Sequence, residues 1–260
     1  MLKISGVVIT FNEAAHIRAC IESLRQVCDE IIVVDSYSRD ETVELAKQAG
    51  ATVYQREYPG DGPQINYGAE RASNDWILRM DADERLDADA VEFIRSLDFA
   101  RTQHEAYAFC RKNYVGTHWI KAAGFYPEYV TRLYRRSRCG FTNTGRHDYV
   151  KTRSVSKARS VSKARAHIIH YTYRDYSNWV DKLNKLSDID SRLMYEHGIR
   201  THRWAPVTHA LAAAIRKLLL KGGIFQGLDG ITVSLTTVFR IYMKYLKLYE
   251  LQQKRGGTRD

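Results

Sequence analysis

The sequence lacks a long hydrophobic run. Its longest stretch without a charged residue covers the twelve positions 204–215, whereas a transmembrane helix needs about 20 consecutive apolar residues. The N-terminus also has no apolar segment that leads to a small-residue cleavage site. We therefore expect neither a membrane-spanning helix nor a secretory signal peptide.

Cysteine is also scarce. The four cysteines form no C-x-x-C pair and have no paired spacing with histidine: Cys20, Cys28, Cys110 and Cys139. This usage favours a reduced cytosolic compartment and argues against a disulfide framework or a zinc site. A glycine-rich phosphate loop is missing after the first apolar segment, which disfavours a nucleotidyltransferase.

Acidic residues are few in the C-terminal part. Residues 1–150 hold 19 basic and 22 acidic side chains, whereas residues 151–260 hold 21 basic and 8 acidic ones, so the net charges are −3 and +13. Such asymmetry indicates a polyanionic partner, which could be nucleic acid, an anionic membrane surface or a phosphorylated substrate. With 44% hydrophobic residues in 260, the chain can also bury a sizeable core.

The N-terminal part alternates between strand and helix patterns. Residues 4–9 are short and β-branched, and Thr10 and Glu13 then have capping-box spacing. The following helix places four apolar residues on one face: Ile17, Ile21, Leu24 and Cys28. This alternation predicts β-α-β units on a largely parallel sheet.

The same pattern then repeats. Residues 31–34 form an apolar run that ends in Asp35, and Ser38 to Glu41 offer a second capping box before a helix that stops near Gly50. Further elements are expected over 51–54 (strand), 64–72 (helix) and 76–80 (strand), the last leading into Asp81-Ala82-Asp83-Glu84. The sequence therefore predicts an α/β fold.

Polar side chains follow the expected strands. Ligands of parallel sheets bind at the carboxyl ends of the strands, and these ends carry Thr10 with Glu13, then Asp35, then Asp81 with Asp83. Several carboxylates at one edge are costly unless a cation or hydrogen-bond donors neutralise them. A divalent ion that is completed by phosphate oxygens would meet this need.

These motifs resemble family 2 inverting glycosyltransferases with the GT-A fold. The resemblance rests on residues 10–13, 34–36 with 40–42, and 78–84, and it continues through 124–128, 132–136 and 145–148. Residues 170–171, 182–187, 227–230 and 239–248 resemble the C-terminal region of bacterial lipopolysaccharide inner-core β-glucosyltransferases. The resemblance implies a GT-A nucleotide-diphospho-sugar transferase fold over 1–170 and a helical extension over 171–260.

The resemblance also implies a donor site. Thr10, Glu13 and Asp35 would hold the uridine of a UDP-sugar, and Arg71 or Arg79 would touch its diphosphate. Asp81 and Asp83 would bind Mg or Mn together with that diphosphate, with His170 as a further possible ligand.

Inversion of the sugar requires a base on the far side of the anomeric carbon. Asp148 occupies the position of the family's acidic base, although this sequence has His-Asp where the subgroup commonly has His-Glu. The aspartate side chain is one methylene shorter than that of glutamate, and Glu128 is the reserve candidate. The subgroup suggests glucose as the sugar and an inner-core heptose as the acceptor.

The pattern of the C-terminal part predicts three amphipathic helices. In the first, four apolar residues recur at helical spacing: Trp179, Leu183, Leu186 and Ile189. Its mixture of basic and apolar residues suits a helix in a membrane interface, and packing on the catalytic domain is an equal alternative. We expect a lipid-linked core oligosaccharide acceptor at the cytoplasmic face of the inner membrane and no nucleic-acid partner. The patterns do not indicate an oligomeric state.

A hexapeptide is duplicated without change over 154–159 and 160–165. Because six is even, a strand here would keep Arg153, Lys157, Arg159, Lys163 and Arg165 on one face, while a surface loop without a role is the alternative.

Two other functions stay open. One is transfer to polyprenyl phosphate or another cell-surface polysaccharide, because the donor edge would look the same. The other is RNA binding by the basic part beside a degenerate catalytic domain, which would give strongly salt-dependent binding.

Overall fold

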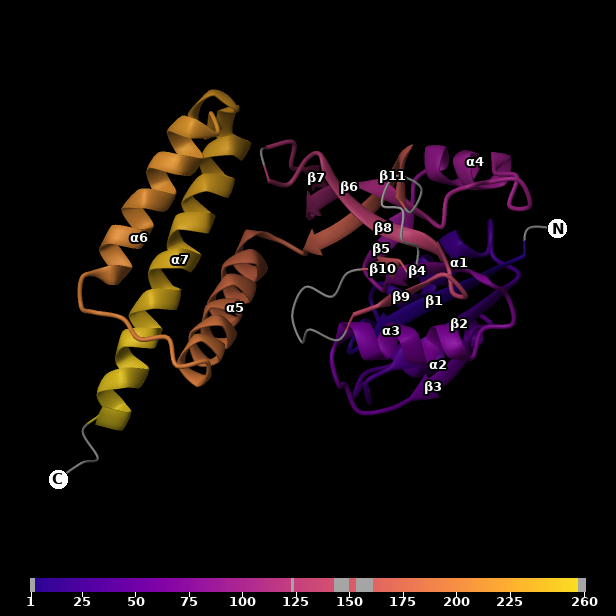
Figure 1. Cartoon of the computed structure of the whole chain (residues 1–260), viewed down its shortest axis with the longest axis horizontal. Helices are drawn as coiled ribbons and strands as arrows, with labels where there is room; N and C mark the ends of the chain where they lie inside the picture. The colour runs from indigo at the N-terminus through magenta and orange to yellow at the C-terminus, as the bar shows by residue number, and fades with distance from the viewer. Residues whose placement is uncertain (1–2, 123, 143–149, 153–160, 257–260) are drawn as a thin grey trace. The chain divides into compact units, whose positions relative to one another are not determined.

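The computed structural model describes residues 3–122, 124–142, 150–152 and 161–256. The chain forms two compact units (Figure 1). The first, which we call the sheet unit, comprises Met1–Lys112 and Glu128–Tyr171, and the second, the helical unit, comprises Asn113–Pro127 and Thr172–Asp260. The expected roles of 1–170 and 171–260 concern function and stay predictions.

The main sheet has the strand order β3-β2-β1-β4-β8-β6-β11-β5, and β7 pairs with β6. Its strands have these bounds: β1 Ile4–Thr10, β2 Glu30–Asp35, β3 Thr52–Gln55, β4 Trp76–Asp81, β5 Glu84–Leu86, β6 Ala106–Val115, β7 His118–Trp119, β8 Glu128–Arg135 and β11 Val161–Tyr173. Strands β3, β2, β1 and β4 are parallel neighbours, whereas β8 runs antiparallel to both β4 and β6. The predicted α/β class is confirmed, with parallel pairing concentrated in the N-terminal strands.

Four helices and a small second sheet complete the sheet unit. Their bounds are α1 Ile17–Leu24, α2 Thr42–Gln48, α3 Asp61–Glu70, α4 Ala88–Ser96, β9 Cys139–Phe141 and β10 Val150–Thr152.

The central strands bury both of their faces. In β2, Ile31 and Val33 belong to one core cluster and Ile32 and Val34 to another. A strand that is covered on both sides has a continuous apolar sequence, which explains the run at 31–34. Polar residues are therefore found at the strand ends, where Thr10 pairs in register with Asp35 and Ile9 with Asp81.

Neither predicted capping box forms. Thr10 is the last residue of β1, and α1 begins at Ile17 without a side-chain cap. The Ser38 hydroxyl donates to Asp35, and α2 also begins without a side-chain cap. The reason in the second case is competition, because the carboxylate that ends β2 lies within reach of Ser38.

The third helix begins earlier than predicted. It starts at Asp61 rather than near Gln64, after Gly60 with φ of 124°. Pro63 fits within its first turn because the N–H groups there have no partner inside the helix.

The helical unit contains α5 Tyr176–Glu196, α6 Ala205–Ala214, η2 Ile215–Leu220, η3 Gly223–Phe225 and α7 Gly227–Gly256. The three predicted helical segments are present, and the second continues from α6 as the π-helix η2. Within the described residues, no helix combines the length and apolar character needed to cross a bilayer.

The predicted apolar face of α5 is half wrong. Trp179 and Leu183 are buried, but Leu186 and Ile189 are exposed. Polar residues are buried further along this helix, where Asp190 pairs with a basic side chain of α7: Arg240 Nη2 lies 2.8 Å from Asp190 Oδ2. A polar seam between α5 and α7 thus replaces the second half of the expected apolar stripe.

The second copy of the hexapeptide partly overlaps β11. Lys163 and Arg165 are exposed, whereas Ala164 and Ala166 are buried, so these two basic residues share a face as predicted. Arg153, Lys157 and Arg159 lie outside the described residues.

Candidate active site

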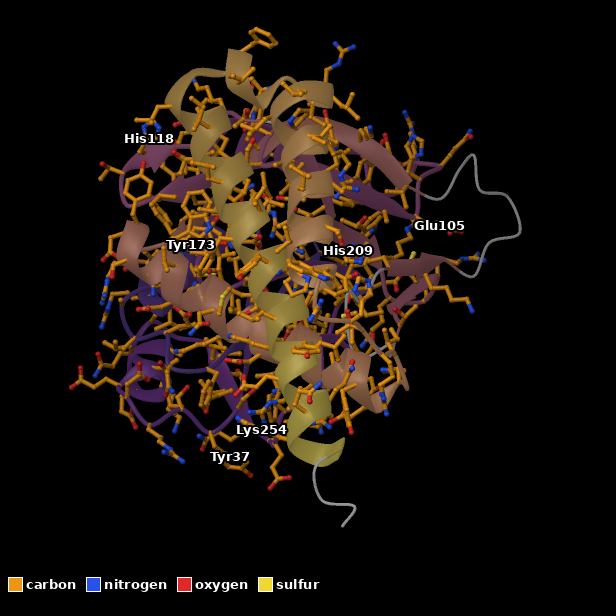
Figure 2. All side chains as sticks on the ribbon, turned by 90° about the vertical axis from the view of Figure 1, so that its left-hand side faces the viewer. Tyr37, Glu105, His118, Tyr173, His209 and Lys254 are labelled. Atoms are coloured by element: carbon orange, nitrogen blue, oxygen red, sulfur yellow. The ribbon has the colours of Figure 1, made fainter. Side chains whose placement is uncertain are left out.

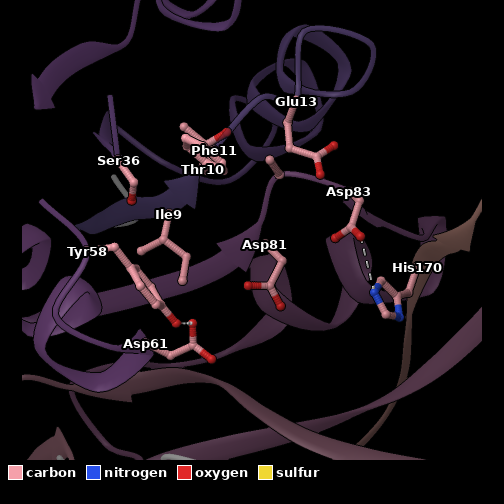
Figure 3. A pocket seen from close by; sticks show the side chains of 11 residues that line it. Ile9, Thr10, Phe11, Glu13, Ser36, Tyr58, Asp61, Asp81, Asp83 and His170 are labelled. Carbon is pink, nitrogen blue, oxygen red and sulfur yellow. Dashed lines mark hydrogen bonds and ion pairs between the residues drawn. The ribbon is translucent and has the colours of Figure 1, made fainter. Parts of the chain in front are cut away.

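A pocket of about 540 Å³ opens at the carboxyl ends of β1 and β4 (Figure 3). Its walls are strand ends, the loops that follow them and one residue of β11: Ile9, Thr10, Phe11, Glu13, Ser36, Tyr58, Asp61, Asp81, Ala82, Asp83 and His170. All of them belong to the sheet unit. This is the edge at which parallel sheets bind ligands.

Thr10 and Glu13 both reach the pocket. Thr10 is 5% exposed, and its Oγ1 has no hydrogen-bond partner among the described residues. The backbone N–H of Glu13 donates to Thr42 Oγ1 over 2.8 Å, which fixes the loop after β1. A buried hydroxyl without a partner is costly, so Thr10 offers a bound ligand one hydrogen-bonding group.

Asp35 lies behind the pocket wall. It is fully buried, and its Oδ2 accepts hydrogen bonds from Ser38 N and Gln55 Nε2, each over 2.9 Å. Ser36, the next residue, lines the pocket instead. Asp35 therefore shapes the loop after β2.

The two candidate arginines have different surroundings. The Arg71 guanidinium lies 3.3 Å from the centre of the Tyr67 ring and donates to the Tyr67 carbonyl over 3.0 Å. Arg79 is buried, and its Nη2 lies 2.8 Å from Asp81 Oδ1. Neither arginine lines the pocket, but Arg79 contacts Asp81, which does.

Asp83 and His170 face each other in the pocket (Figure 3). His170 Nε2 lies 3.5 Å from Asp83 Oδ2, and their side chains are 13% and 17% exposed. The backbone supports this approach, because Tyr171 N donates to the Asp83 carbonyl over 3.0 Å. Strand β11 therefore places His170 beside the carboxylate of Asp83, a residue that lies far earlier in the sequence.

A buried arginine bridge lies beneath the acidic edge. Arg132 Nη2 lies 2.9 Å from Asp81 Oδ2 and 2.6 Å from Glu84 Oε1, and Arg132 Nε donates to Glu84 Oε2 over 2.8 Å. Glu84 Oε2 also accepts from the Asp81 backbone N–H over 3.1 Å. This network holds the backbone and the carboxylate of Asp81 together.

The surroundings of Glu84 and Arg132 favour the ionised form of both side chains. Burial alone would raise the pKa of Glu84, but Arg132, His170 and Arg111 lower that pKa to about 2. Burial would likewise lower the pKa of Arg132, yet Glu84 and Asp81 raise it above its ordinary value. Glu84 and Arg132 are therefore an ionised pair in a fully buried position.

Glu128, the reserve base, is engaged by an arginine. Arg111 Nη2 lies 2.7 Å from Glu128 Oε1, and Arg111 Nε donates to Glu128 Oε2 over 3.1 Å. This two-point contact is the strong geometry for an arginine and a carboxylate. Asp148, the first candidate, lies outside the described residues.

The metal prediction can be tested against the available ligands. Within the described ranges, no group of three or more His, Cys, Asp or Glu is placed to hold an ion by itself. Asp81 is held by Arg79 and Arg132, so Asp83 and His170 are the better-placed pair. Magnesium sites that act on phosphates commonly use one or two carboxylates and take the remaining ligands from phosphate and water. Asp83 supplies one such carboxylate, so this position fits an ion completed by a diphosphate.

Sequence reasoning missed Glu84 and Arg132 as site residues. Both belong to motifs that carried the family resemblance, but 48 positions separate the two. The only available signal was the identity of the residues, since a charged pair at this separation gives no periodic pattern.

Comparisons with known proteins agree with the motifs. The model of glycosyl transferase family 2 matches residues 5–163. A protein of Rickettsia felis that is described only as an uncharacterized glycosyltransferase is 28% identical over 256 residues, which cover 96% of this chain and 90% of the relative. The lipopolysaccharide core biosynthesis glycosyltransferase LpsC of Rhizobium meliloti is 27% identical over 263 residues and covers 96% of this chain and 93% of LpsC.

Solved structures give a weaker match. Glucosyl-3-phosphoglycerate synthase from Mycobacterium tuberculosis, in complex with Mn²⁺, UDP and glucosyl-3-phosphoglycerate, has 27% sequence identity and a TM-score of 0.35 over 44% of each chain. This TM-score is too low to transfer the geometry of the ligands.

Proposed function

The chain belongs to glycosyl transferase family 2, and we propose that it transfers glucose from UDP-glucose to a lipopolysaccharide core acceptor with inversion at the anomeric carbon. The observation that carries the proposal is the convergence of separate motifs on one pocket. Thr10 ends β1 and Glu13 follows it, Asp81 ends β4 and Asp83 follows it, and His170 comes from β11.

The donor's nucleotide occupies the part of the pocket nearest β1 in this proposal. Thr10 supplies a buried hydroxyl for uridine, and Glu13 contributes from the adjoining loop. Asp35 acts from behind Ser36 by holding the loop after β2. Of the two arginines, Arg79 is better placed for the diphosphate, because Arg71 lies against Tyr67.

Asp83 and His170, with Asp81 beside them, would hold Mg²⁺ or Mn²⁺. When bound, the ion supplies Lewis-acid neutralisation of the diphosphate leaving group. The protein's own contribution is rigidity, because Arg132 and Glu84 fix the turn that presents Asp81 and Asp83.

We assign the base role to Asp148. Its carboxylate takes the proton of the acceptor hydroxyl while that oxygen bonds to the anomeric carbon and the bond from this carbon to the diphosphate breaks. The contact of Glu128 with Arg111 supports the choice, because both Glu128 oxygens already accept charged hydrogen bonds.

The acceptor is a lipid-linked core oligosaccharide with an inner-core heptose as the receiving sugar. The lipopolysaccharide core rests on the similarity to LpsC along most of both chains, and the heptose rests only on the resemblance of the C-terminal motifs to inner-core β-glucosyltransferases. Such an acceptor is available to the enzyme at the cytoplasmic face of the inner membrane, so we propose peripheral association there. The basic residues of the C-terminal part favour an anionic surface.

Calorimetric titration tests the proposal. The purified protein is titrated with UDP-glucose, UDP-galactose and UDP-N-acetylglucosamine, each with Mn²⁺ and then with excess EDTA. We expect binding of UDP-glucose that EDTA abolishes, followed by transfer to isolated heptose-containing core in a product assay. If neither UDP nor any UDP-sugar binds, the donor assignment is wrong. If sugar is transferred only to polyprenyl phosphate, the acceptor is polyprenyl phosphate and not the core oligosaccharide.

A further inference from the structure

The turn between α6 and α7 exposes large apolar side chains. This turn joins η2 to the start of α7 through η3, at one end of the α6–α7 hairpin (Figure 1). Four apolar side chains on it are largely exposed: Leu220 (78%), Ile224 (49%), Phe225 (86%) and Leu228 (77%). We call these four residues the apolar tip. Single exposed apolar residues are common, but a contiguous group marks an interaction site.

The backbone of the turn is tightly packed at its glycines. A Cβ atom at Gly230 would lie 2.1 Å from the Gly223 carbonyl oxygen, and one at Gly223 would lie 2.4 Å from Ser234 Oγ. Gly222 and Gly227 have φ of 66° and 65°, a conformation that favours glycine. The apolar tip therefore projects from a turn whose two chain segments are in close contact.

The exposed apolar surface continues along α6 and η2. Five exposed residues recur at spacings of three or four: Trp204, Val207, Leu211, Ile215 and Leu219. Ala205, Pro206, Ala210 and Ala213 are buried and pack on the opposite side of the helix. On the side toward α7, His209 stacks on Tyr245 with ring centres 3.9 Å apart (Figure 2). The helix is thus apolar on both its packed and its outer face.

Basic residues surround the apolar tip. Arg216 and Lys217 precede the apolar tip and Lys221 follows its first residue, Leu220; residues 197–249 contain eight Lys or Arg but only one acidic residue, Asp229. Burial, Lys221 and Arg216 lower the pKa of Lys217, which indicates crowded positive charge. An anion near these three side chains would relieve that repulsion.

We propose that the α6–α7 hairpin docks on an anionic lipid bilayer, with the apolar tip in the interface and Arg216, Lys217 and Lys221 at the phosphates of the headgroups. Apolar side chains flanked by basic ones are the composition of interfacial helices, and acidic lipids attract each well-placed basic residue. The docking surface deepens the proposed function, because it would hold the enzyme where a lipid-linked acceptor lies.

Vesicle sedimentation tests the docking directly. The full chain is mixed with vesicles of phosphatidylcholine alone or of phosphatidylcholine with phosphatidylglycerol. The variant Phe225→Ser with Leu228→Ser should weaken binding to the mixed vesicles ~tenfold or more. Its control, Val180→Ser with Ile189→Ser, removes two exposed apolar residues of α5 (46% and 51% exposed) and should bind like the wild type.

A second pair of variants tests the charge. Lys217→Gln with Lys221→Gln should weaken binding to mixed vesicles ~tenfold, since each basic residue contributes. Lys185→Gln with Arg192→Gln removes the same charge from exposed positions of α5 and should have a smaller effect. Wild-type binding to plain phosphatidylcholine should be weak.

Several outcomes would overturn the proposal. It fails if the wild-type chain ignores mixed vesicles or if the apolar-tip variant binds them unchanged. It also fails if the chain is a dimer that Phe225→Ser with Leu228→Ser converts to a monomer while vesicles are not bound. Calorimetry with UDP-glucose on the same variants separates this result from the proposed function, because loss of docking should leave donor binding intact.

Discussion

The two units depart from the usual distribution of polar and apolar residues in opposite ways. The sheet unit buries charge, since Glu84 is fully buried and Arg132 is 4% exposed. The helical unit instead exposes apolar side chains, with Leu220 at 78% and Phe225 at 86%. Both arrangements cost stability in an isolated protein, because buried charge and exposed apolar surface are each unfavourable.

The difference indicates where each unit meets its ligand. A buried ionised network holds a binding edge in a fixed shape, which suits a small charged donor. An outward-facing apolar tip suits a broad, soft partner that can receive it. The donor site and the docking surface should therefore respond to different mutations. Four changes test either the donor site or the difference between the two units.

The largest effect should come from Asp83→Asn. The change removes a negative oxygen from the pair with His170 while keeping the shape of the side chain. Metal-dependent binding of UDP-glucose should disappear in calorimetry, and vesicle binding should be unchanged. Asp87→Asn is the control, since Asp87 caps α4 and pairs with Lys112 away from the pocket. If Asp83→Asn binds UDP-glucose normally in the presence of the metal, Asp83 is not a ligand of the metal ion.

Asp148→Asn should separate donor binding from transfer. Loss of the base should lower turnover ~10²–10⁴-fold while UDP-glucose still binds. Glu128→Gln is the matched variant and should keep most turnover, because Glu128 is engaged by Arg111. If Glu128→Gln abolishes transfer and Asp148→Asn does not, the roles of these two residues are reversed.

Removing one paired arginine from each unit should lower the free energy of unfolding by different amounts. Arg132→Met leaves Glu84 buried without its main partner and should lower the free energy of unfolding by ~3–5 kcal/mol. Arg240→Met breaks the contact with Asp190 in the helical unit, where the Asp190 side chain is 6% exposed but the Arg240 side chain is 35% exposed. Because water reaches the Arg240 end of this pair, the loss should be smaller than for Arg132→Met, about 1–3 kcal/mol.

Hydrogen exchange read separately for β4 and α5 measures these losses. Adding Glu84→Gln to Arg132→Met should recover part of the stability, because the unpaired charge is then removed. If the two units lose the same free energy of unfolding, burial of the ion pair does not determine the cost of breaking it.

The smallest effect should come from Glu30→Gln. Burial raises the pKa of Glu30, but hydrogen bonds from Ser5 and Ser73 outweigh it and lower the pKa below its ordinary value. The ionised group therefore stabilises the fold above its ordinary pKa of about 4.3, and that contribution is lost as pH falls through the lowered pKa.

Urea unfolding between neutral and acidic pH checks this expectation. Glu30→Gln should cost about 1 kcal/mol at pH 7, and the difference from wild type should shrink in acid. Asp175→Asn, at the exposed N-cap of α5, is the counterpart in the helical unit and should change stability less. A difference for Glu30→Gln that persists in acid would assign the effect to shape rather than charge.

The sequence predicted those parts of the fold that follow from local patterns. The apolar run at 31–34 indicated a doubly buried strand, and the polar residues after three strands indicated the binding edge. The second capping box failed because the Ser38 hydroxyl has a competing partner in Asp35. The α5 face failed at Ile189 because a buried carboxylate, Asp190, pairs with a residue 50 positions away.

Long-range charge pairs mark the limit of that reasoning. Arg132 is one of several arginines in a short segment, and its contacts with Asp81 and Glu84 depend on the antiparallel pairing of β4 with β8. No spacing in the sequence distinguishes it from Arg135, Arg136 and Arg138, which are less buried. The family resemblance singled out its segment, and the structure identified its role.

The arginine bridge also has an evolutionary consequence. Arg79 and Arg132 contact Asp81, and Arg132 and Arg111 contact Glu84, so the protein itself offsets much of the repulsion at its acidic edge. The walls of the pocket therefore do not depend on a bound cation to stay together. Exchange of Asp83 or His170 in a descendant of this chain should therefore remove the proposed metal site and leave the sheet folded. The freedom to diversify lies at the surface of the pocket, and the constraint lies one layer below.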